Sequence, residues 1–308
     1  MAISIDNPFE PMRSWLFLPG ADMDALIAAP TTGADVLVQE LEDFTPAALR
    51  PKAREIAPQV MNEWRRRGVV PAVRINPLET CGLDDLAGVM PGRPAVVMMS
   101  KVESPAQMEA LAAEITRWEA HLAIPAGSTH IVPNIESALG IVRAIEIAQA
   151  SKRIPAMLVG TEDMVVDLGA DRQRDGAELF YPRSRFLLEC AAAGVLAIDS
   201  PYTFSDHDGA QADLRTSRAI GYKAKAVVNA DLVAMTNRAS TPSDEQVAAA
   251  HKQIAAFEAA LLEGRSRADV DGLVVEYPSY NSAKRILKRH ALLSTMVAAR
   301  ERAHATLG

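Results

Sequence analysis

The chain of 308 residues has only two cysteines and no long apolar run, and these absences exclude several classes of protein. Neither Cys81 nor Cys190 has a second Cys or a His at metal-ligand spacing, so we expect no structural zinc site. No stretch approaches the roughly 20 apolar residues of a membrane span, so no membrane partner is expected. Residues 1–9 lack the basic start and apolar core of a signal peptide, which predicts a cytoplasmic protein.

The sequence also lacks any basic run or basic patch with interleaved aromatic residues. Its net charge is −7, so a nucleic-acid partner is not expected. An anionic substrate would meet no overall attraction and would need arginine or lysine side chains placed at the site itself.

Eight short apolar, β-rich segments alternate with segments of helical spacing. The eight segments are 13–19, 36–43, 71–76, 95–102, 130–137, 156–163, 195–202 and 224–231. Such alternation predicts parallel βαβ units, and eight of them favour a closed (β/α)₈ barrel, a TIM barrel, over an open sheet. No Gly-x-Gly-x-x-Gly or P-loop pattern follows any of the strands, which argues against a dinucleotide-binding sheet.

The clearest predicted helices between these strands cover 104–120, 137–151 and 177–193. The first opens with Ser-Pro, a helix cap followed by proline at the first helical position. After about Ser240 the alternation stops, and a helix to about 263, a strand-like run at 272–276 and a last helix from about 280 to 305 follow. We therefore predict a catalytic barrel domain over 1–240 and a helical extension, or lid, over 241–308.

Polar or ionisable groups stand at seven of the eight predicted strand ends. Active sites of these barrels lie at the carboxyl ends of the strands, so the pattern predicts an enzyme. The groups are Glu42, Asp43, Arg74, Asn76, Lys101, Glu103, Glu136, Glu162, Asp163, Asp199 and Asn229.

Carboxylates that converge on one barrel mouth repel each other unless a cation joins them or some stay protonated. Oxygen ligands suit Mg²⁺ or Mn²⁺ better than zinc, and Glu136 and Asp163 could supply two of them. Structural roles remain alternatives at this point. Glu136 and Asp163 could serve only as helix-start charges, Arg74 could form a structural salt bridge, and Lys101 could be a solvated loop residue.

Several motifs, in this order, resemble the citrate lyase β-subunit-like proteins of the HpcH/HpaI aldolase superfamily. The most specific is the block that begins Ile-Glu-Ser at 135–137 and is followed by Gly-Thr-Glu-Asp at 160–163. Supporting motifs are Arg-Ser-x-Leu-Phe-x-Pro-Gly at 13–20, Leu-Glu-Asp at 41–43, Val-Arg-Ile-Asn at 73–76 and Ala-Ile-Asp-Ser at 197–200. The resemblance covers residues 13–229, with a weaker echo at 272–284.

The resemblance implies a Mg²⁺-dependent barrel enzyme that forms trimers or hexamers, with a C-terminal segment closing over a neighbour's site. It places Glu136 and Asp163 on the metal carboxylates and Arg74 on an arginine that faces the substrate. The other residues it assigns are the acidic pair near the metal waters, Glu42 and Asp43, and the substrate contacts Arg13, Phe17, Glu162 and Asn229.

The sequence departs from the family pattern at several positions. Glu40 stands where the family usually has Asp, and Asn229 is followed by Ala rather than Pro. Glu276 stands where an Asp of the family enters the adjacent subunit's site. Asp22 and Ala28 stand where some CoA-lyase relatives carry basic residues.

The resemblance implies cleavage of a 3-hydroxy-acyl thioester of citramalyl-CoA, malyl-CoA or citryl type to a 2-keto acid and an acyl thioester. Arg74 would stabilise the developing oxyanion, and Glu276 of a neighbouring chain would act as acid or base. Two alternatives stay open. One is an acyl-CoA thioesterase, and the other is a subunit that depends on an acyl carrier protein or has no catalytic activity.

Overall fold

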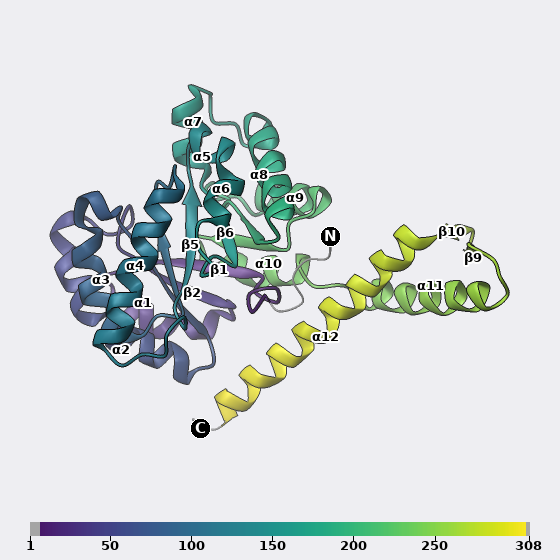
Figure 1. Cartoon of the computed structure of the whole chain (residues 1–308), viewed down its shortest axis with the longest axis horizontal. Helices are drawn as coiled ribbons and strands as arrows, with labels where there is room; N and C mark the ends of the chain where they lie inside the picture. The colour runs from purple at the N-terminus through teal and green to yellow at the C-terminus, as the bar shows by residue number, and fades with distance from the viewer. Residues whose placement is uncertain (1–6, 306–308) are drawn as a thin grey trace.

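A computed structural model describes residues 7–305, and eight of their strands close into one parallel barrel (Figure 1). Each strand pairs with its neighbours in sequence order, and β1 also pairs with β8, which closes the sheet. The predicted (β/α)₈ fold is confirmed. The strands are β1 Ser14–Pro19, β2 Val36–Glu40, β3 Val70–Ile75, β4 Val96–Met99, β5 His130–Ile135, β6 Ala156–Val159, β7 Leu196–Asp199 and β8 Ala224–Val227.

Helices surround the barrel. Short turns flank them: the 3-10 turns are η1 Ala29–Thr32, η2 Ala47–Leu49, η4 Met90–Gly92, η5 Ala177–Leu179 and η6 Ala230–Leu232, and η3 Leu78–Gly82 is a π turn. The helices are α1 Met23–Ala28, α2 Arg50–Arg66, α3 Leu83–Val89, α4 Pro105–His121, α5 Ala138–Val142, α6 Ala144–Gln149, α7 Thr161–Leu168, α8 Phe180–Ala193, α9 His207–Ile220 and α10 Val233–Ala239.

The start of α4 confirms the Ser-Pro prediction, because the backbone N–H of Ser104 donates to the side chain of Gln107 at 3.1 Å. The predicted helix over 137–151 was too long. It breaks at Arg143, whose ψ of 9° is not helical, into α5 and α6.

The predicted strand over 156–163 was also too long. β6 ends at Val159, Gly160 is extended, and Thr161 already begins α7. Glu162 and Asp163 therefore lie in the first turn of a helix, where the helix dipole favours negative charge.

Two apolar layers hold the barrel, one between the strands and the helices and one inside the barrel. Side chains alternate along each strand, so Trp15 and Met98 point inward and are wholly buried. The charged side chain of Arg74 enters the interior from β3 near the carboxyl ends of the strands. The barrel interior therefore has an apolar core, with polar groups above it at the carboxyl ends of the strands.

The extension after Ser240 comprises α11 Asp244–Leu262, a hairpin of β9 Ala268–Val270 and β10 Leu273–Val275, and α12 Tyr277–Ala305. Arg289 anchors α12 to the amino end of the barrel by donating to the carbonyl oxygens of Glu10 and Lys223 at 2.8 and 2.9 Å. From this anchor α11 and the hairpin project away from the barrel (Figure 1).

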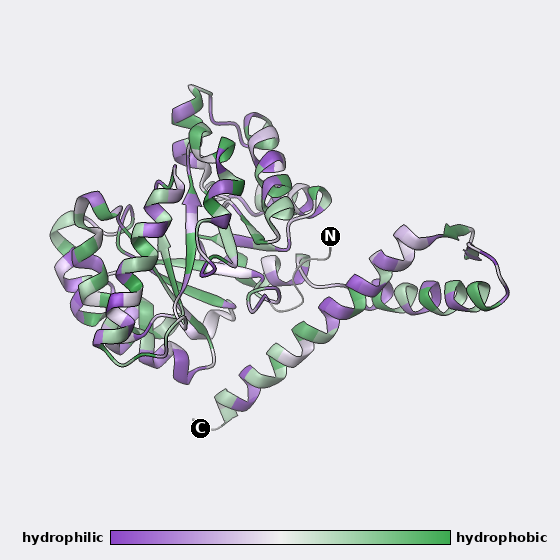
Figure 2. Cartoon of the chain, viewed as in Figure 1, coloured by the Kyte–Doolittle hydropathy of each residue, from purple (hydrophilic) through white to green (hydrophobic). Residues whose placement is uncertain are grey.

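Apolar residues mark the tip of this projection, as Figure 2 shows in green. Leu273 and Val274 are 62% and 60% exposed there. Within residues 7–305, none of the helices combines the length and the apolar character needed to cross a membrane.

Candidate active site

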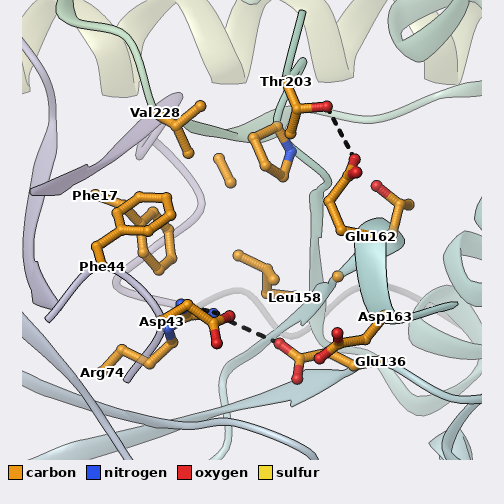
Figure 3. A pocket seen from close by; sticks show the side chains of 14 residues that line it. Phe17, Asp43, Phe44, Arg74, Glu136, Leu158, Glu162, Asp163, Thr203 and Val228 are labelled. Carbon is orange, nitrogen blue, oxygen red and sulfur yellow. Dashed lines mark hydrogen bonds and ion pairs between the residues drawn. The ribbon is translucent and has the colours of Figure 1, made fainter. Parts of the chain in front are cut away.

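A pocket opens at the carboxyl end of the barrel, and Figure 3 shows two unlike sides. Glu136, Glu162 and Asp163 lie on one side, and Phe17, Phe44 and Val228 lie on the other, with Leu158 between them. The full lining consists of Phe17, Asp43, Phe44, Arg74, Glu136, Leu158, Gly160, Thr161, Glu162, Asp163, Pro201, Thr203, Ala226 and Val228. Six of the residues singled out from the sequence therefore line the same pocket.

Arg74 is the cation of this pocket, and its side chain is only 10% exposed. Its guanidinium lies 2.8 Å from Glu40, 3.2 Å from Glu42 and 3.6 Å from Glu136. Its carbon Cζ also lies 5.4 Å from the centre of the Phe17 ring, a cation–π distance. Burial alone would lower the pKa of Arg74, but these carboxylates raise it well above its usual range. Arg74 is therefore a fixed positive charge.

Glu40 is the acidic residue nearest to the guanidinium of Arg74. Its carboxylate is wholly buried and accepts hydrogen bonds from Arg74 Nε at 2.8 Å and from the backbone N–H groups of Glu42 and Phe44 at 2.6 and 2.5 Å. One side chain thus fixes both the guanidinium and the turn that follows β2. The sequence showed Glu40 only as a departure from a motif. The signal for its role is an acidic residue at the last, inward-facing position of a strand.

Glu136 follows β5 and accepts a hydrogen bond from the backbone N–H of Lys101 at 3.1 Å. Burial raises the pKa of Glu136 to about 7, and the nearby charges of Glu42 and Asp163 add to the effect while Arg74 opposes it. Its side chain packs against Gly160, where an added Cβ would lie 2.6 Å from Glu136 Cγ. The glycine is what leaves room for this carboxylate.

Lys101 lies in a loop and its side chain is about half exposed, as one alternative from the sequence allowed, but its ammonium is paired with acidic groups of the site. Its ammonium lies 2.8 Å from Glu42 and 3.9 Å from Asp163, and the hydrogen bond to Glu42 raises the pKa of Lys101. Its φ of 55° is unusual for a residue with a side chain. That backbone turn directs the Lys101 N–H to Glu136 and its ammonium to Glu42 and Asp163, a placement that strand periodicity cannot predict.

The first turn of α7 supplies two more acidic groups. Asp163 is about half exposed, and Figure 3 shows its carboxylate next to that of Glu136. Glu162 accepts from Thr203 Oγ1 at 2.9 Å and from Arg172 Nε at 3.2 Å.

Two predicted substrate contacts are not part of the pocket. Arg13 precedes β1 at the opposite, amino end of the barrel, where its guanidinium donates two hydrogen bonds of 2.8 and 2.9 Å to the buried Asp35. Asn229 is exposed and accepts from the backbone N–H of Asp231 as the cap of η6. Its neighbour Val228 lines the pocket instead. The motif match located these strands but not the direction of each side chain.

Asp199 also turns away from the mouth. It follows the inward-facing Ile198, so strand alternation directs its carboxylate behind the barrel wall. There it lies 2.9 Å from both Arg183 Nε and Lys225 Nζ.

Glu276 lies outside the pocket of its own chain. It is exposed between β10 and α12, on the segment that projects from the barrel (Figure 1). Its backbone N–H donates to Ser279 Oγ at 2.9 Å.

The pocket suits a hard divalent cation. Among the residues that the structure describes, no group of three or more His, Cys, Asp or Glu is arranged to hold a metal ion. Two adjacent carboxylates, Glu136 and Asp163, nevertheless face the pocket, and Mg²⁺ typically takes one or two protein carboxylates together with water and substrate oxygens. Glu42 lies in the same ion-pair network and adds a further negative charge beside these two carboxylates.

Comparisons with known proteins give consistent results. The sequence profile of the HpcH/HpaI aldolase/citrate lyase family matches residues 13–230. Citrate lyase subunit beta of Leuconostoc mesenteroides subsp. cremoris is 31% identical over 278 residues, which are 90% of this chain and 92% of the relative. A (3S)-malyl-CoA thioesterase of Cereibacter sphaeroides is 29% identical over 286 residues, covering 91% and 94%.

Among solved structures, CitE of Mycobacterium tuberculosis in complex with magnesium, acetoacetate and coenzyme A superposes with a TM-score of 0.74. The two chains are 28% identical, and the match covers 91% of this chain and 98% of that one.

Proposed function

Because the chain belongs to the HpcH/HpaI aldolase/citrate lyase family, we propose that it is a Mg²⁺-dependent carbon–carbon lyase. Its substrate would be a 3-hydroxy-acyl thioester of citramalyl, malyl or citryl type, and its products a 2-keto acid and an acyl thioester. The observation that carries the proposal is the position of Arg74 beside the paired carboxylates Glu136 and Asp163 in one pocket. The magnesium complex of the mycobacterial relative supports the choice of cation. Mn²⁺ has the same preference for oxygen ligands.

Glu136 and Asp163 would hold the cation, which when bound lowers the pKa of the substrate hydroxyl as a Lewis acid. A base takes the hydroxyl proton, and the bond between the hydroxyl-bearing carbon and the thioester's α-carbon breaks. The electron pair moves to the thioester as an enolate, whose carbon then receives a proton. Arg74 would stabilise the developing oxyanion with its planar fork. Glu42 and Asp43 would orient water around the cation, while Phe17 and Glu162 would contact the substrate.

We propose that Glu276 supplies the acid or base from a neighbouring subunit of a trimer or hexamer. Its exposed position on the projecting segment and the exposed Leu273 and Val274 beside it support a contact between chains. Residues 241–308 would then form a lid that excludes water from the enolate. We expect the reaction to take place in the cytoplasm.

Mixed oligomers test this shared site. Chains carrying Glu136→Ala and chains carrying Glu276→Gln should each be inactive, yet mixing them should restore activity where an intact metal site meets an intact lid. Mixed oligomers that form, as mass spectrometry would detect, but remain inactive would contradict a shared site.

Two other activities have specific support. The malyl-CoA thioesterase relatives favour a thioesterase, and the citrate lyase β-subunit relatives favour an enzyme that needs an acyl carrier protein.

Product analysis distinguishes the three activities after the purified chain is incubated with Mg²⁺ and citramalyl-, malyl- and citryl-thioesters. A lyase releases equal amounts of 2-keto acid and acyl thioester. A thioesterase releases a free thiol and the intact hydroxy acid. Turnover of carrier-bound but not CoA-bound thioesters would identify a carrier-dependent subunit.

A further inference from the structure

Lys101 contacts both of the carboxylates proposed to hold the divalent cation. Its backbone N–H donates to Glu136 Oε2 at 3.1 Å, and its ammonium lies 3.9 Å from Asp163 Oδ2. The ammonium also donates to Glu42 Oε1 at 2.8 Å. A positive side chain therefore lies within the group of carboxylates that would attract the cation, although the proposed reaction assigns it no role.

The backbone around Lys101 fixes where this charge lies. Lys101 has φ 55°, in the left-handed region that residues with a side chain seldom adopt. On either side, the N–H of Ser100 donates to the carbonyl oxygen of Ile75 at 3.4 Å, and the N–H of Val102 donates to that of Asn134 at 3.1 Å. These bonds tie the turn to β3 and β5, so backbone contacts hold the turn independently of the ammonium.

The ammonium has opposite effects on the two kinds of charged ligand that the pocket would bind. It neutralises part of the negative charge of Glu42 and Asp163, and it repels a divalent cation held by Glu136 and Asp163. The same charge attracts an anionic ligand, which otherwise meets a barrel mouth rich in carboxylates. The Lys101 side chain is 51% exposed, so water screens both effects without abolishing them.

We infer that Lys101 sets the balance of charge at this site: its ammonium limits the affinity for the divalent cation and raises the affinity for the anionic substrate. The inference rests on the proposed function, because it takes Glu136 and Asp163 as the metal ligands. Loss of a purely structural lysine would weaken the binding of both ligands. Loss of this charge should instead strengthen the binding of one and weaken the binding of the other.

Two variants remove the charge and keep the turn. Lys101→Met retains the aliphatic stem, and Lys101→Gly adopts φ 55° without strain and keeps the N–H that donates to Glu136. In calorimetric titrations of the full-length protein at constant pH and ionic strength, both should bind Mg²⁺ about tenfold more tightly than the wild type. The Mg²⁺-saturated variants should bind pyruvate, a singly charged 2-keto acid, about threefold more weakly, because half the charge gives about half the change in free energy.

Lys52→Met is the matched control, because Lys52 on α2 is 52% exposed and lies 3.4 Å from Glu55, outside the pocket. It should leave both dissociation constants at their wild-type values. One folded variant of the Lys101 pair is enough for the test. If it binds Mg²⁺ no more tightly than the wild type, or pyruvate no more weakly, the inference is wrong and the proposed function stands. If the wild-type protein binds no Mg²⁺ and turns over no thioester, the proposed function fails and the inference fails with it.

Discussion

Replacing Gly160 by alanine tests the metal site at its tightest contact. The glycine has φ −95° and ψ 124°, which alanine adopts freely, so the backbone itself adds no strain. The new methyl group would lie 2.6 Å from Glu136 Cγ and 3.0 Å from its Oε1. Ordinary carbon contacts need about 3.5 Å, so the carboxylate must move by about 1 Å. It cannot move freely, because the backbone N–H of Lys101 and the guanidinium of Arg74 hold it on its other sides.

A displacement of about 1 Å at a catalytic group typically costs about 100-fold in rate. We therefore expect Gly160→Ala to lower kcat/KM about 100-fold and to weaken Mg²⁺ binding in calorimetric titration. Overpacking should reduce the free energy of unfolding by only about 1–3 kcal/mol, so the variant should still be folded at 25 °C.

Gly88→Ala is the matched control, because its added Cβ would lie 2.5 Å from Arg54 Cβ, a similar overlap outside the pocket. It should lose stability but keep Mg²⁺ affinity and kcat/KM. Combining Gly160→Ala with Glu136→Asp shortens the clashing side chain by one methylene, so the double variant should regain the free energy of unfolding that Gly160→Ala loses. A Gly160→Ala protein with wild-type Mg²⁺ affinity and activity would refute the assignment of Glu136 as a metal ligand in this position.

Three further predictions concern charge. Glu136→Ala or Asp163→Ala should abolish Mg²⁺ binding with the barrel still folded, and wild-type calorimetric affinity in both variants would contradict the metal assignment. Arg74→Lys should lose most of kcat/KM, since lysine cannot copy the planar fork; full activity would make Arg74 structural. Burial opposes ionisation of Asp199, but Lys225 and Arg183 hold the pKa of Asp199 well below its usual range. Asp199 thus stabilises the fold above its unfolded pKa of about 4 and loses this effect as the pH falls. Asp199→Asn should cost about 3 kcal/mol in urea unfolding at pH 7 and leave Mg²⁺ binding unchanged.

The order of strands and helices could be predicted because it depends on local periodicity and capping. The ends of the elements could not always be predicted. Residues 160–163 follow an apolar run with Gly-Thr-Glu-Asp, and the apolar pattern did not predict that the strand ends before Gly160 and that α7 begins at Thr161. The break at Arg143 has no Pro beside it, and Gly140 lies three residues earlier inside α5, so the spacing of apolar residues alone did not predict where the helix ends.

The residues of the candidate site also differ in whether the sequence could predict their roles. Glu136, Arg74 and Asp163 could be predicted because strand ends in a barrel must converge. The role of Lys101 could not, because it depends on a left-handed backbone turn and on carboxylates 59 and 62 positions away in sequence. The resemblance assigned Arg13 to the substrate, but Arg13 directly precedes β1, and the start of a barrel strand lies at the amino end, opposite the mouth.

The two departures from the family pattern that add a methylene, Glu40 and Glu276, differ in their physical setting. Glu40 is wholly buried, and both of its oxygens accept hydrogen bonds, so the longer side chain is a fixed part of the support for Arg74. Glu276 is exposed, and in its own chain the segment that carries it lies away from the barrel mouth. In the proposed assembly, its extra methylene would be absorbed by how the segment docks on a neighbouring chain. The Glu40 exchange thus leaves the chemistry of the pocket intact, whereas the effect of the Glu276 exchange depends on the assembly.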